Sequence, residues 1–500
     1  MLREFGLLNR IRHFAATRAE QACLIYGRDR MTWHELSARV TILAPVIRSR
    51  LVGRKARVAL QISDPFAFLS ALIGTASAGA AAVPIPERIG PQNLQRLSED
   101  CDPGLFITDT DWPPLLAEAL ELAETDDRVG PEGGGSMSAS TTDPDMMILY
   151  SSGTTGQPKG VIHTALTRAH AAARMNHEYG MTPNSHTLIT APLYTARALS
   201  PIIATLVAGG VAVITDRFEP RQLMQTLREH APTTIDLVPT QFVMLLDQPD
   251  FSPALLRSCE YVLCTGSALD RALADELFRI LPDSFIEGYG STETDHVSRS
   301  KRRAPVDKRG SVGPPAPDIE LRVLDEHRRP VAPGGVGELA VASASNLRGY
   351  VNEELTRRQL LDFESRNFFL TGDLGRLDPD GYLWLAGRAK DMIITGGFNV
   401  YATDLESVLR GHPAVTDVAV VGTPHRVLGE TPLAFVVLRA DLPRPTEAQL
   451  CSWANARLDK NQGLLGVVVI ERIPTNASGK PLKDELRTRV SAQKGLERRA

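Results

Sequence analysis

The sequence predicts an α/β protein: a large N-terminal part built on parallel sheets, then an antiparallel β subdomain and a small α+β domain. Three observations lead to this fold class. Short apolar runs alternate with amphipathic segments from residue 145, period-two strands replace them after Gly310, and helices interleave with strands again from Lys390. With 500 residues the chain is also too long for one hydrophobic core, so we expect at least two domains.

The alternating part of the chain accounts for the parallel sheets. Short apolar runs bounded by turn signals predict buried strands at residues 146–150, 187–191, 211–215, 234–238 and 261–264. Amphipathic helices are predicted between them, at 221–230 and 270–281. Earlier, the segment 66–85 has the length of a membrane span. Its many small residues, with Gly79 and Pro84, favour a buried helix followed by a short strand.

The later elements define the other two parts. Predicted strands at 319–324, 336–341 and 368–385, with turns at Pro333-Gly334 and Asp380-Gly381, indicate an antiparallel subdomain. Helices at 402–410 and 446–458 and strands at 418–421, 434–438 and 467–473 follow. We therefore place a domain boundary at Lys390, giving domains 1–389 and 390–500. The segment 124–142, rich in glycine and small polar residues, is interpreted as an exposed loop inside the first domain.

Composition excludes several classes of protein. Hydrophobic residues make up 43% and charged residues 23% of the chain, which is ordinary for a globular protein. A net charge of -4 gives no reason to expect nucleic acid or an anionic membrane as a partner. Five scattered cysteines without a C-x-x-C pair argue against a disulfide framework or a zinc site. With no apolar stretch at the N-terminus to form a signal peptide, we expect a cytoplasmic protein without a membrane span.

The strongest functional signal is the string Y-S-S-G-T-T-G-Q-P-K-G, which runs from Tyr150 to Gly160. A strand leads into a loop whose glycines allow backbone N–H groups to approach phosphate, whose hydroxyls add donors, and whose Lys159 adds charge. It is not a Walker A loop, because no G-K-[ST] follows at the required spacing. A polar surface turn is the alternative for most loops of this composition, but the full string is far more specific.

Further motifs follow in order: E-G-Y-G-S-T-E-T at 287–294, T-G-D at 371–373, G-R-A-K-D at 387–391 with G-G-F-N-V-Y at 396–401, and N-A-S-G-K at 476–480. Together they resemble the core motifs of the adenylate-forming superfamily: acyl- and aryl-CoA synthetases, peptide-synthetase adenylation domains and luciferases. The resemblance covers nearly the whole chain. It implies two mainly parallel βα sheets in an N-terminal AMP-binding domain that holds the ATP and acid sites, and a mobile C-terminal domain that rotates about Lys390.

Residue chemistry adds roles for some of these positions. Glu293 is a hard oxygen ligand beside hydroxyls, suited to Mg²⁺ held between a carboxylate and ATP phosphate, although an isolated glutamate is usually only solvated. Asp373, interpreted as lying between a strand and a turn, either accepts from the ribose hydroxyls or only forms the turn. Arg388 offers a fork for phosphate or ribose oxygens, or lies on the surface. Lys480 can stabilise the charge that develops when a carboxylate attacks the α-phosphate.

The resemblance implies that the catalytic residues are Lys480, Glu293, Lys159 and Thr292, with Glu293 as the metal ligand and Lys480 serving the adenylation half-reaction. The ATP-binding residues that it implies are Ser151, Ser152, Gly153, Thr154, Thr155, Lys159, Ser267, Ala268, Glu287, Gly288, Tyr289, Gly290, Ser291, Thr292, Asp373, Arg388 and Lys480.

An acid pocket is also implied by the resemblance, lined by Tyr194, Thr195, Arg197, Thr240, Gly266 and Gly288. Thr195 stands where many relatives carry a histidine. Small residues at Gly288 and Ala268 would give the pocket depth. Arg197 has two interpretations: it pairs with a second polar group on the acid, or it is an outward-facing or structural arginine, which is the favoured one.

The thiol tunnel is implied at Gly396 and Gly397, with Lys390 as the hinge. Relatives that use CoA commonly carry a W-G-E triplet, here Leu428-Gly429-Glu430, and an aromatic-Lys-x-Pro run, here residues 461–464. Few stacking and basic contacts are therefore predicted for the CoA nucleotide, although Lys460, Arg426 and His425 remain. The acceptor is either CoA or the phosphopantetheine of an acyl or peptidyl carrier protein.

We therefore expect ATP- and Mg²⁺-dependent activation of a small carboxylic acid through an acyl-adenylate, followed by acyl transfer to a thiol. An adenylating ligase with an amine acceptor is the second hypothesis. A catalytically silent nucleotide-binding regulator is the third, and the intact Glu293, Asp373, Arg388, Lys159 and Lys480 count against it.

Overall fold

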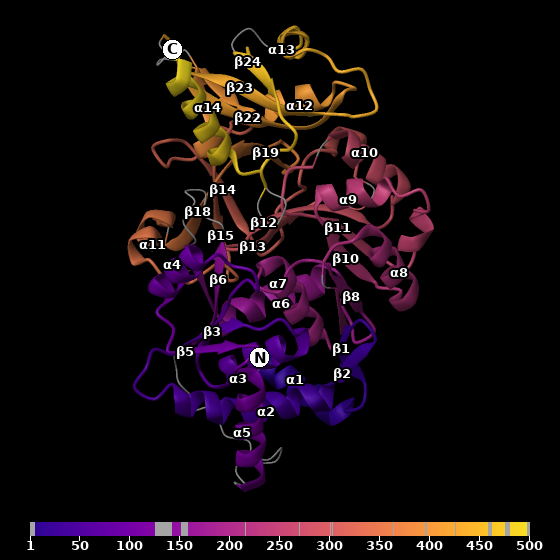
Figure 1. Ribbon diagram of the computed structural model, residues 1–500, viewed down its shortest axis with the longest axis vertical. Helices are drawn as coiled ribbons and strands as arrows, with labels where there is room; N and C mark the ends of the chain where they lie inside the picture. The colour runs from indigo at the N-terminus through magenta and orange to yellow at the C-terminus, as the bar shows by residue number, and fades with distance from the viewer. Residues whose placement is uncertain are drawn as a thin grey trace.

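The computed structural model describes residues 6–125, 143–151, 159–215, 217–269, 271–300, 302, 304–363, 365–395, 398–425, 427–458, 463–475 and 481–497. The N-terminal helices lie at one end of the long axis, and the C-terminal sheet and helices lie at the other (Figure 1). Most of the loop predicted at 124–142 falls outside the described residues.

An eight-stranded sheet in the described part of the chain has the order β13-β12-β11-β10-β8-β9-β1-β2. All neighbours from β12 to β1 pair in parallel, and the edge strands β13 and β2 pair antiparallel. The strands are β1 (Ala22–Tyr26), β2 (Asp29–Thr32), β8 (His186–Ile189), β9 (Val211–Ile214), β10 (Thr234–Leu237), β11 (Tyr261–Cys264), β12 (Phe285–Ser291) and β13 (Asp295–Arg299). The four strands predicted from 187 to 264 are thus present and parallel.

A second sheet, six-stranded within the described ranges, has the order β16-β7-β6-β4-β3-β5. Its centre is parallel, whereas β6 and β7 form an antiparallel hairpin that β16 extends. The strands are β3 (Arg57–Gln61), β4 (Ala81–Pro84), β5 (Leu105–Thr108), β6 (Asp145–Ser151), β7 (Lys159–Thr164) and β16 (Gly349–Tyr350).

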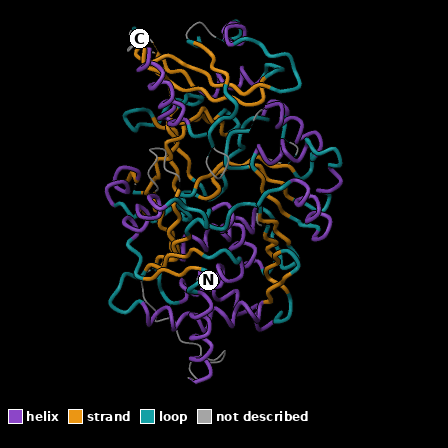
Figure 2. Tube along the Cα trace, in the orientation of Figure 1, coloured by secondary structure: helices purple, strands orange, loops and turns teal. Residues whose placement is uncertain are grey.

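Helices separate and cover these sheets (Figures 1 and 2). They are α1 (Leu7–Thr17), α2 (Trp33–Arg50), α3 (Pro65–Ser77), α4 (Pro91–Cys101), α5 (Trp112–Thr125), α6 (Ala165–Glu178), α7 (Ala196–Ala208), α8 (Pro220–His230), α9 (Pro239–Leu246) and α10 (Arg271–Ile280). α6 and α7 lie between the two sheets, so α7 is buried at every position from Ala198 to Ala208. Gly209 ends α7 at φ +88°, and a Cβ there would lie 2.3 Å from the Phe14 ring.

The segment 66–85 folds as predicted, into α3 followed by β4. Each residue of α3 from Ala67 to Thr75 is buried, which explains its low charge without a membrane. Among the helices of the described residues, none combines the length and the apolar character needed to cross a bilayer.

The antiparallel subdomain also matches its prediction. Its sheet, five-stranded in the part of the chain described, runs β14-β15-β18-β17, with β19 paired to β18. The elements are β14 (Glu320–Leu324), β15 (Gly337–Ala342), α11 (Glu353–Gln359), β17 (Leu360–Phe363), β18 (Arg366–Leu377) and β19 (Leu383–Arg388). The predicted turn at Asp380-Gly381 joins β18 to β19, with Gly381 at φ +80°.

Asp373 lies inside a strand, and the expectation that it sits between a strand and a turn was wrong. Gly372 has φ +71°, and the register shifts between Leu374 and Gly375, so the chain bends at this point. β18 nevertheless continues to Leu377, because β15 and β19 supply backbone partners on both sides. Thr-Gly-Asp resembles a turn in sequence but forms a bend within a sheet.

The last part of the chain forms an α+β unit. Its sheet has the order β21-β20-β23-β22, and β24 pairs in parallel with β23. The elements are β20 (Met392–Thr395), β21 (Phe398–Tyr401), α12 (Ala402–Arg410), β22 (Val415–His425), β23 (Gly429–Leu438), α13 (Glu447–Asn455), β24 (Gly466–Val469) and α14 (Lys483–Glu497). β22 and β23 are longer than predicted, because their pairing continues as far as His425 and Gly429. β24 is shorter than predicted and pairs with β23 only from Gly466 to Val469.

A buried ion pair joins the layers of the large part. Arg168 of α6 donates through Nη1 to Asp295 Oδ2 at 2.9 Å, and both side chains are almost fully buried. Ser200 of α7 donates to the same carboxylate oxygen at 2.7 Å, and Arg168 Nη2 donates to the Ser345 carbonyl at 3.3 Å. Although burial alone would raise the pKa of Asp295, Arg168 and the other nearby donors hold it below its ordinary value.

We predict that Arg168→Met lowers the free energy of unfolding by about 3–5 kcal/mol, because it leaves the Asp295 carboxylate buried without a counter-charge. Urea denaturation followed by fluorescence measures the change. Arg439→Gln, which removes an exposed ion pair with Asp441, is the control and should change stability by less than about 1 kcal/mol. Equal effects of the two substitutions would contradict the prediction.

Candidate nucleotide and acid site

Motif residues within the described ranges gather where the two parallel sheets meet the antiparallel subdomain. Ser151 ends β6 and pairs with Lys159 at the start of β7, so the hairpin brackets the first motif. The motif with Glu293 occupies the end of β12 and the turn that leads into β13. β16 pairs with β7 and brings Tyr350 to the same place.

Glu293 is held by three groups from two segments of the chain. The Tyr350 hydroxyl donates to Glu293 Oε1 at 3.0 Å, and the backbone N–H of Leu347 donates to the Glu293 carbonyl at 2.7 Å. Ser291 Oγ accepts from the N–H of Glu293 at 3.2 Å, which closes the turn. Burial, and then the neighbouring carboxylate of Glu293, raise the pKa of Tyr350, so its hydroxyl stays protonated and available as a donor.

Lys159 is half-buried beside this carboxylate. Burial is the largest influence on its ammonium and lowers its pKa, the charge of Glu293 opposes that effect, and Arg388 and Lys390 lower the pKa further. The structure therefore brings together charged residues from three distant parts of the sequence: Lys159, Glu293 and the neighbouring pair Arg388 and Lys390.

Asp373 and Arg388 are direct cross-strand partners on β18 and β19. Arg388 Nε donates to Asp373 Oδ1 at 2.8 Å, and the Tyr289 hydroxyl donates to Asp373 Oδ2 at 2.8 Å. The three predicted nucleotide-binding residues are thus adjacent, and Arg388 is paired, not free on the surface. Burial raises the pKa of Tyr289, and the Asp373 carboxylate adds to that effect.

Lys390 lies in a single 3₁₀ turn, Ala389–Asp391, between β19 and β20. Its Nζ is 3.3 Å from Asp484 Oδ2, and Arg487 Nη2 is 2.6 Å from Asp391 Oδ1. Both partners belong to α14, so the turn is tied to the C-terminal unit.

The residues predicted for the acid pocket are more dispersed. Arg197, near the start of α7, pairs through Nε with Asp236 Oδ2 at 3.4 Å and is 19% exposed, so it does not face outward. Gly266 lies beside it, because a Cβ on Gly266 would be 3.5 Å from Arg197 Cδ. The Thr195 hydroxyl donates to the Pro192 carbonyl at 2.7 Å, and Thr240 is exposed at the start of α9. Tyr194 is half-buried, which raises its pKa.

Sequence reasoning missed four polar residues of this region: Asp236, Thr265, His296 and Tyr350. Asp236 carried a signal, since it is a charged residue within the apolar run of β10. The other three carried none, because their positions depend on which strands pair.

The roles of several predicted site residues are not tested by the structure. Ser152, Gly153, Thr154, Thr155, Gly396, Gly397 and Lys480 lie outside the described residues, as does the side chain of Ser151. Ser267 is half-buried and Ala268 exposed in the loop after β11, Gly290 lies near the end of β12, and Thr292 lies in the β12–β13 connection. Their roles stay predictions.

Glu287 is a buried carboxyl group on β12. Burial raises its pKa to about 8, and its Oε2 has no hydrogen-bond partner among the described residues. It therefore carries a proton at neutral pH. Its predicted part in ATP binding also stays a prediction.

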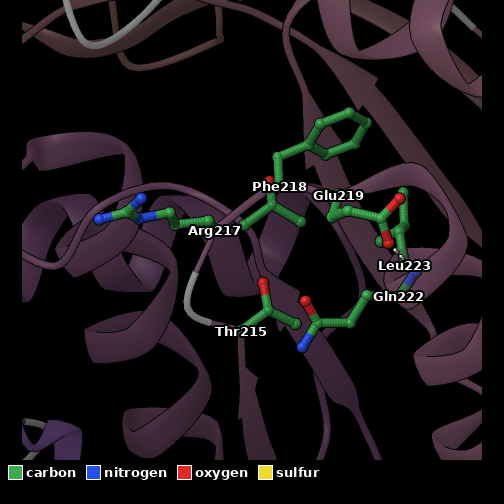
Figure 3. Close-up of a pocket in the computed structure, with 7 residues that line it drawn as sticks. Thr215, Arg217, Phe218, Glu219, Gln222 and Leu223 are labelled. Carbon is green, nitrogen blue, oxygen red and sulfur yellow. Dashed lines mark hydrogen bonds between the residues drawn. The ribbon is translucent and has the colours of Figure 1, made fainter.

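A narrow hollow lies near the carboxyl ends of β8 and β9, lined in part by Thr190, Thr215 and Glu219 (Figure 3). The Glu219 carboxylate in its wall accepts from the N–H groups of Arg221 and Gln222, so it caps α8. Thr190, also in the wall, donates to the Asp236 carbonyl at 3.2 Å. The hollow adjoins the acid region but is separate from the Glu293 cluster.

Comparisons with known proteins agree with this arrangement. The crystal structure of ATP bound MatB from Rhodopseudomonas palustris has a TM-score of 0.82, covers 96% of this chain and 98% of its own, and is 27% identical. A feruloyl-CoA synthase from Amycolatopsis sp is 32% identical over 476 residues, 93% of this chain and 95% of that protein. A long-chain-fatty-acid–CoA ligase, FadD13 of Mycobacterium tuberculosis, is 29% identical over 496 residues, 93% of this chain and 94% of its own.

Fold and site thus define an adenylate-forming enzyme of the AMP-forming acid–thiol ligase class, as the sequence motifs predicted. Residues 11–351 match the AMP-binding enzyme family and residues 404–480 match the AMP-binding enzyme C-terminal domain, so the chain belongs to the AMP-binding enzyme family.

We predict that Glu287→Gln stabilises the protein at pH 8 but not at pH 4.5. The folded-state pKa of about 8 lies above the ordinary 4.5, so the unfolded state ionises first and wild-type stability falls as pH rises between these values. At about 1.4 kcal/mol per pH unit, wild type loses at most about 5 kcal/mol of unfolding free energy between these pH values, and the glutamine variant avoids that loss. Urea unfolding at several pH values measures it, with the exposed Glu354→Gln as control. Parallel pH profiles for wild type and Glu287→Gln would contradict it.

Proposed function

We propose that the protein activates a small carboxylic acid with ATP, forming an acyl-adenylate and pyrophosphate, and then transfers the acyl group to the thiol of CoA. The observation that carries this proposal is the convergence of Lys159, Glu293, Asp373 and Arg388 from four separate strands and turns on one place. Full-length relatives named as CoA ligases support the choice of acceptor.

The residues fit a nucleotide bound across this place. The Asp373 carboxylate, fixed by Tyr289 and Arg388, can accept hydrogen bonds from ribose hydroxyls. Lys159 can neutralise phosphate oxygens. Its lowered pKa comes chiefly from burial, so a phosphate would favour the charged ammonium.

A magnesium ion fits Glu293. No group of three or more His, Cys, Asp or Glu side chains suited to a metal is present in the described ranges, so an all-protein cage is not available there. Mg²⁺ is commonly held by one or two carboxylates together with substrate phosphates and water. Tyr350 occupies only Oε1 of Glu293, which leaves Oε2 for such an ion. When bound, the ion would neutralise charge on the phosphates.

The chemistry then balances in two steps. A carboxylate oxygen of the acid forms a bond to the α-phosphorus of ATP while the bond to the pyrophosphate leaving group breaks. The thiol sulfur next forms a bond to the acyl carbon, the bond to AMP breaks, and the thiol proton leaves to solvent or base. Preorganised positive charge favours the first step, because negative charge grows on the phosphoryl oxygens and on pyrophosphate.

We also propose the domain division at Lys390 and its use as a hinge. The single 3₁₀ turn at 389–391 supports this, since it links strands of two different sheets. The ion pairs from Lys390 and Asp391 to α14 support it further. They attach the turn to the C-terminal unit, so a rotation of that unit would pivot at the turn. The thiol tunnel at Gly396 and Gly397 and the adenylation role of Lys480 rest on the motif resemblance alone.

Acid-dependent exchange of radiolabelled pyrophosphate into ATP tests the first step, with a panel of aryl, fatty and dicarboxylic acids. The best acid is then tested for product with CoA, pantetheine, a holo-carrier protein and an amine. Because Leu428 stands where CoA-using relatives commonly carry Trp, and is 40% exposed, we predict weak discrimination between CoA and bare pantetheine, with a kcat/KM for pantetheine that is lower by less than about 100-fold. Amide formation without thioester, or carrier-protein acylation without acyl-CoA, would overturn the choice of CoA.

We predict that Glu293→Gln raises the Mg²⁺ concentration needed for half-maximal exchange by about 10-fold or more, because a neutral amide is a poorer ligand for a hard cation. The KM for the acid should change less. Glu354→Gln, an exposed site on α11, is the matched control. An unchanged Mg²⁺ dependence in Glu293→Gln would exclude it as the metal ligand.

A further inference from the structure

An unusual polar lining runs along the acid region. Arg197 of α7 contacts Asp236 of β10 at 3.4 Å, and Thr265, directly after β11, donates its hydroxyl to both carboxylate oxygens of Asp236 at 2.9 and 2.8 Å. The arginine and the aspartate are 19% and 18% exposed, so they are largely but not completely covered by protein.

Two glycines let the backbone pack closely against this lining. A Cβ on Gly266 would lie 3.2 Å from Val238 Cγ1 and 3.5 Å from Arg197 Cδ. A Cβ on Gly288 would lie 3.3 Å from Thr265 Cγ2 and 3.7 Å from His296 Nδ1. The glycines therefore pack beside Arg197 at one end and Thr265 at the other, and Asp236 contacts both of these side chains.

The Arg197 guanidinium has N–H donors that no described residue fully uses. Its Nε is directed to Asp236 Oδ2, and its Nη2 is 3.5 Å from the Asp236 carbonyl, a long contact. Nη1 has no hydrogen-bond partner among the residues that the structure describes. Arg197 thus offers a donor edge next to a carboxylate that can still accept.

The charge of this pair limits which acid can cover it. An alkyl or methyl end would remove the remaining water from both ions and return no hydrogen bond, which is unfavourable. A second carboxylate on the acid would be attracted by Arg197 but repelled by Asp236. An ammonium group would be attracted by Asp236 but repelled by Arg197. A neutral hydroxyl can accept from Arg197 and donate to Asp236 at the same time.

We infer that the acid activated by this protein carries a neutral hydroxyl group at its non-reacting end, and that Arg197 and Asp236 bind that hydroxyl. The inference rests on the proposed adenylation of a carboxylic acid and adds the class of substrate. Arg197, Asp236 and Thr265 are specificity residues in this scheme, with Thr265 holding the aspartate in position.

Pairs of acids that differ only in a terminal hydroxyl or methyl group test it. Suitable pairs are 4-hydroxycinnamate with 4-methylcinnamate, and 10-hydroxydecanoate with undecanoate. Pyrophosphate exchange gives kcat/KM for each acid. In the better scaffold we expect the hydroxyl acid to exceed its methyl partner by about 30-fold or more, because the methyl partner leaves buried polar groups unpaired.

Arg197→Met and Asp236→Asn should each reduce that ratio to below about 5-fold while the KM for ATP stays within about threefold of wild type. Arg439→Gln, at an exposed ion pair in the C-terminal unit, should leave the ratio unchanged. If both substitutions prevent folding, Thr265→Val removes one hydroxyl donor to Asp236 with little change of shape, and it should lower the ratio several-fold.

The outcomes separate the two proposals. Exchange that is equal for hydroxyl and methyl partners, or better with a terminal carboxylate, overturns the inference and leaves adenylation intact. An unchanged ratio in the folded variants also overturns it. Absence of exchange with every acid in wild type overturns the proposed function and the inference with it.

Discussion

The ion pair between Arg168 and Asp295 is the contact on which the rest of the site depends. It joins α6 to the first residue of β13, and Ser200 adds α7 to the same carboxylate. Asp295 has φ +58°, a strained value for a non-glycine residue, and Gly290 must pass it without a side chain, since a Cβ there would lie 2.1 Å from the Asp295 carbonyl oxygen. Glu293 sits in the turn between these residues, so its position follows from that buried pair.

The charged residues above this pair are arranged so that each fixes another. Asp373 is held by Arg388 across a strand pair and by Tyr289 from a different sheet. Tyr350 reaches Glu293 from a two-residue strand that extends the β6–β7 hairpin. Burial keeps both tyrosines protonated, so they act as donors to carboxylates over the physiological pH range. These side chains are therefore held in place before a ligand binds, which reduces the entropy lost on binding.

The predicted acid region differs from this cluster in the cost of burying its charges. Arg197 and Asp236 place a charge pair there, although three of the four residues of β10 are buried. Such a pair is unfavourable to bury unless its hydrogen bonds are completed. Under the inference drawn above, that constraint disfavours purely apolar acids.

The sequence by itself determined the elements and the class. Alternating apolar runs gave the parallel strands from residue 187 to 264, and the ordered motifs gave the superfamily. Its errors were local: Thr371 to Asp373 was interpreted as leading into a turn, because local composition does not reveal that β15 and β19 pair on either side.

Only the tertiary structure decided which side chains meet. Tyr350 comes from β16, Thr265 from the loop after β11, and Asp236 from β10. Nothing in their sequence spacing predicts the contacts that they make. Arg197 was favoured as outward-facing or structural, and only the fold reveals that its partner is Asp236. Propensity and periodicity act over a few residues, whereas these contacts depend on sheet order and on the desolvation that packing imposes. A sequence can therefore identify the residues that carry the chemistry, but the folded chain alone sets the partner of each charge.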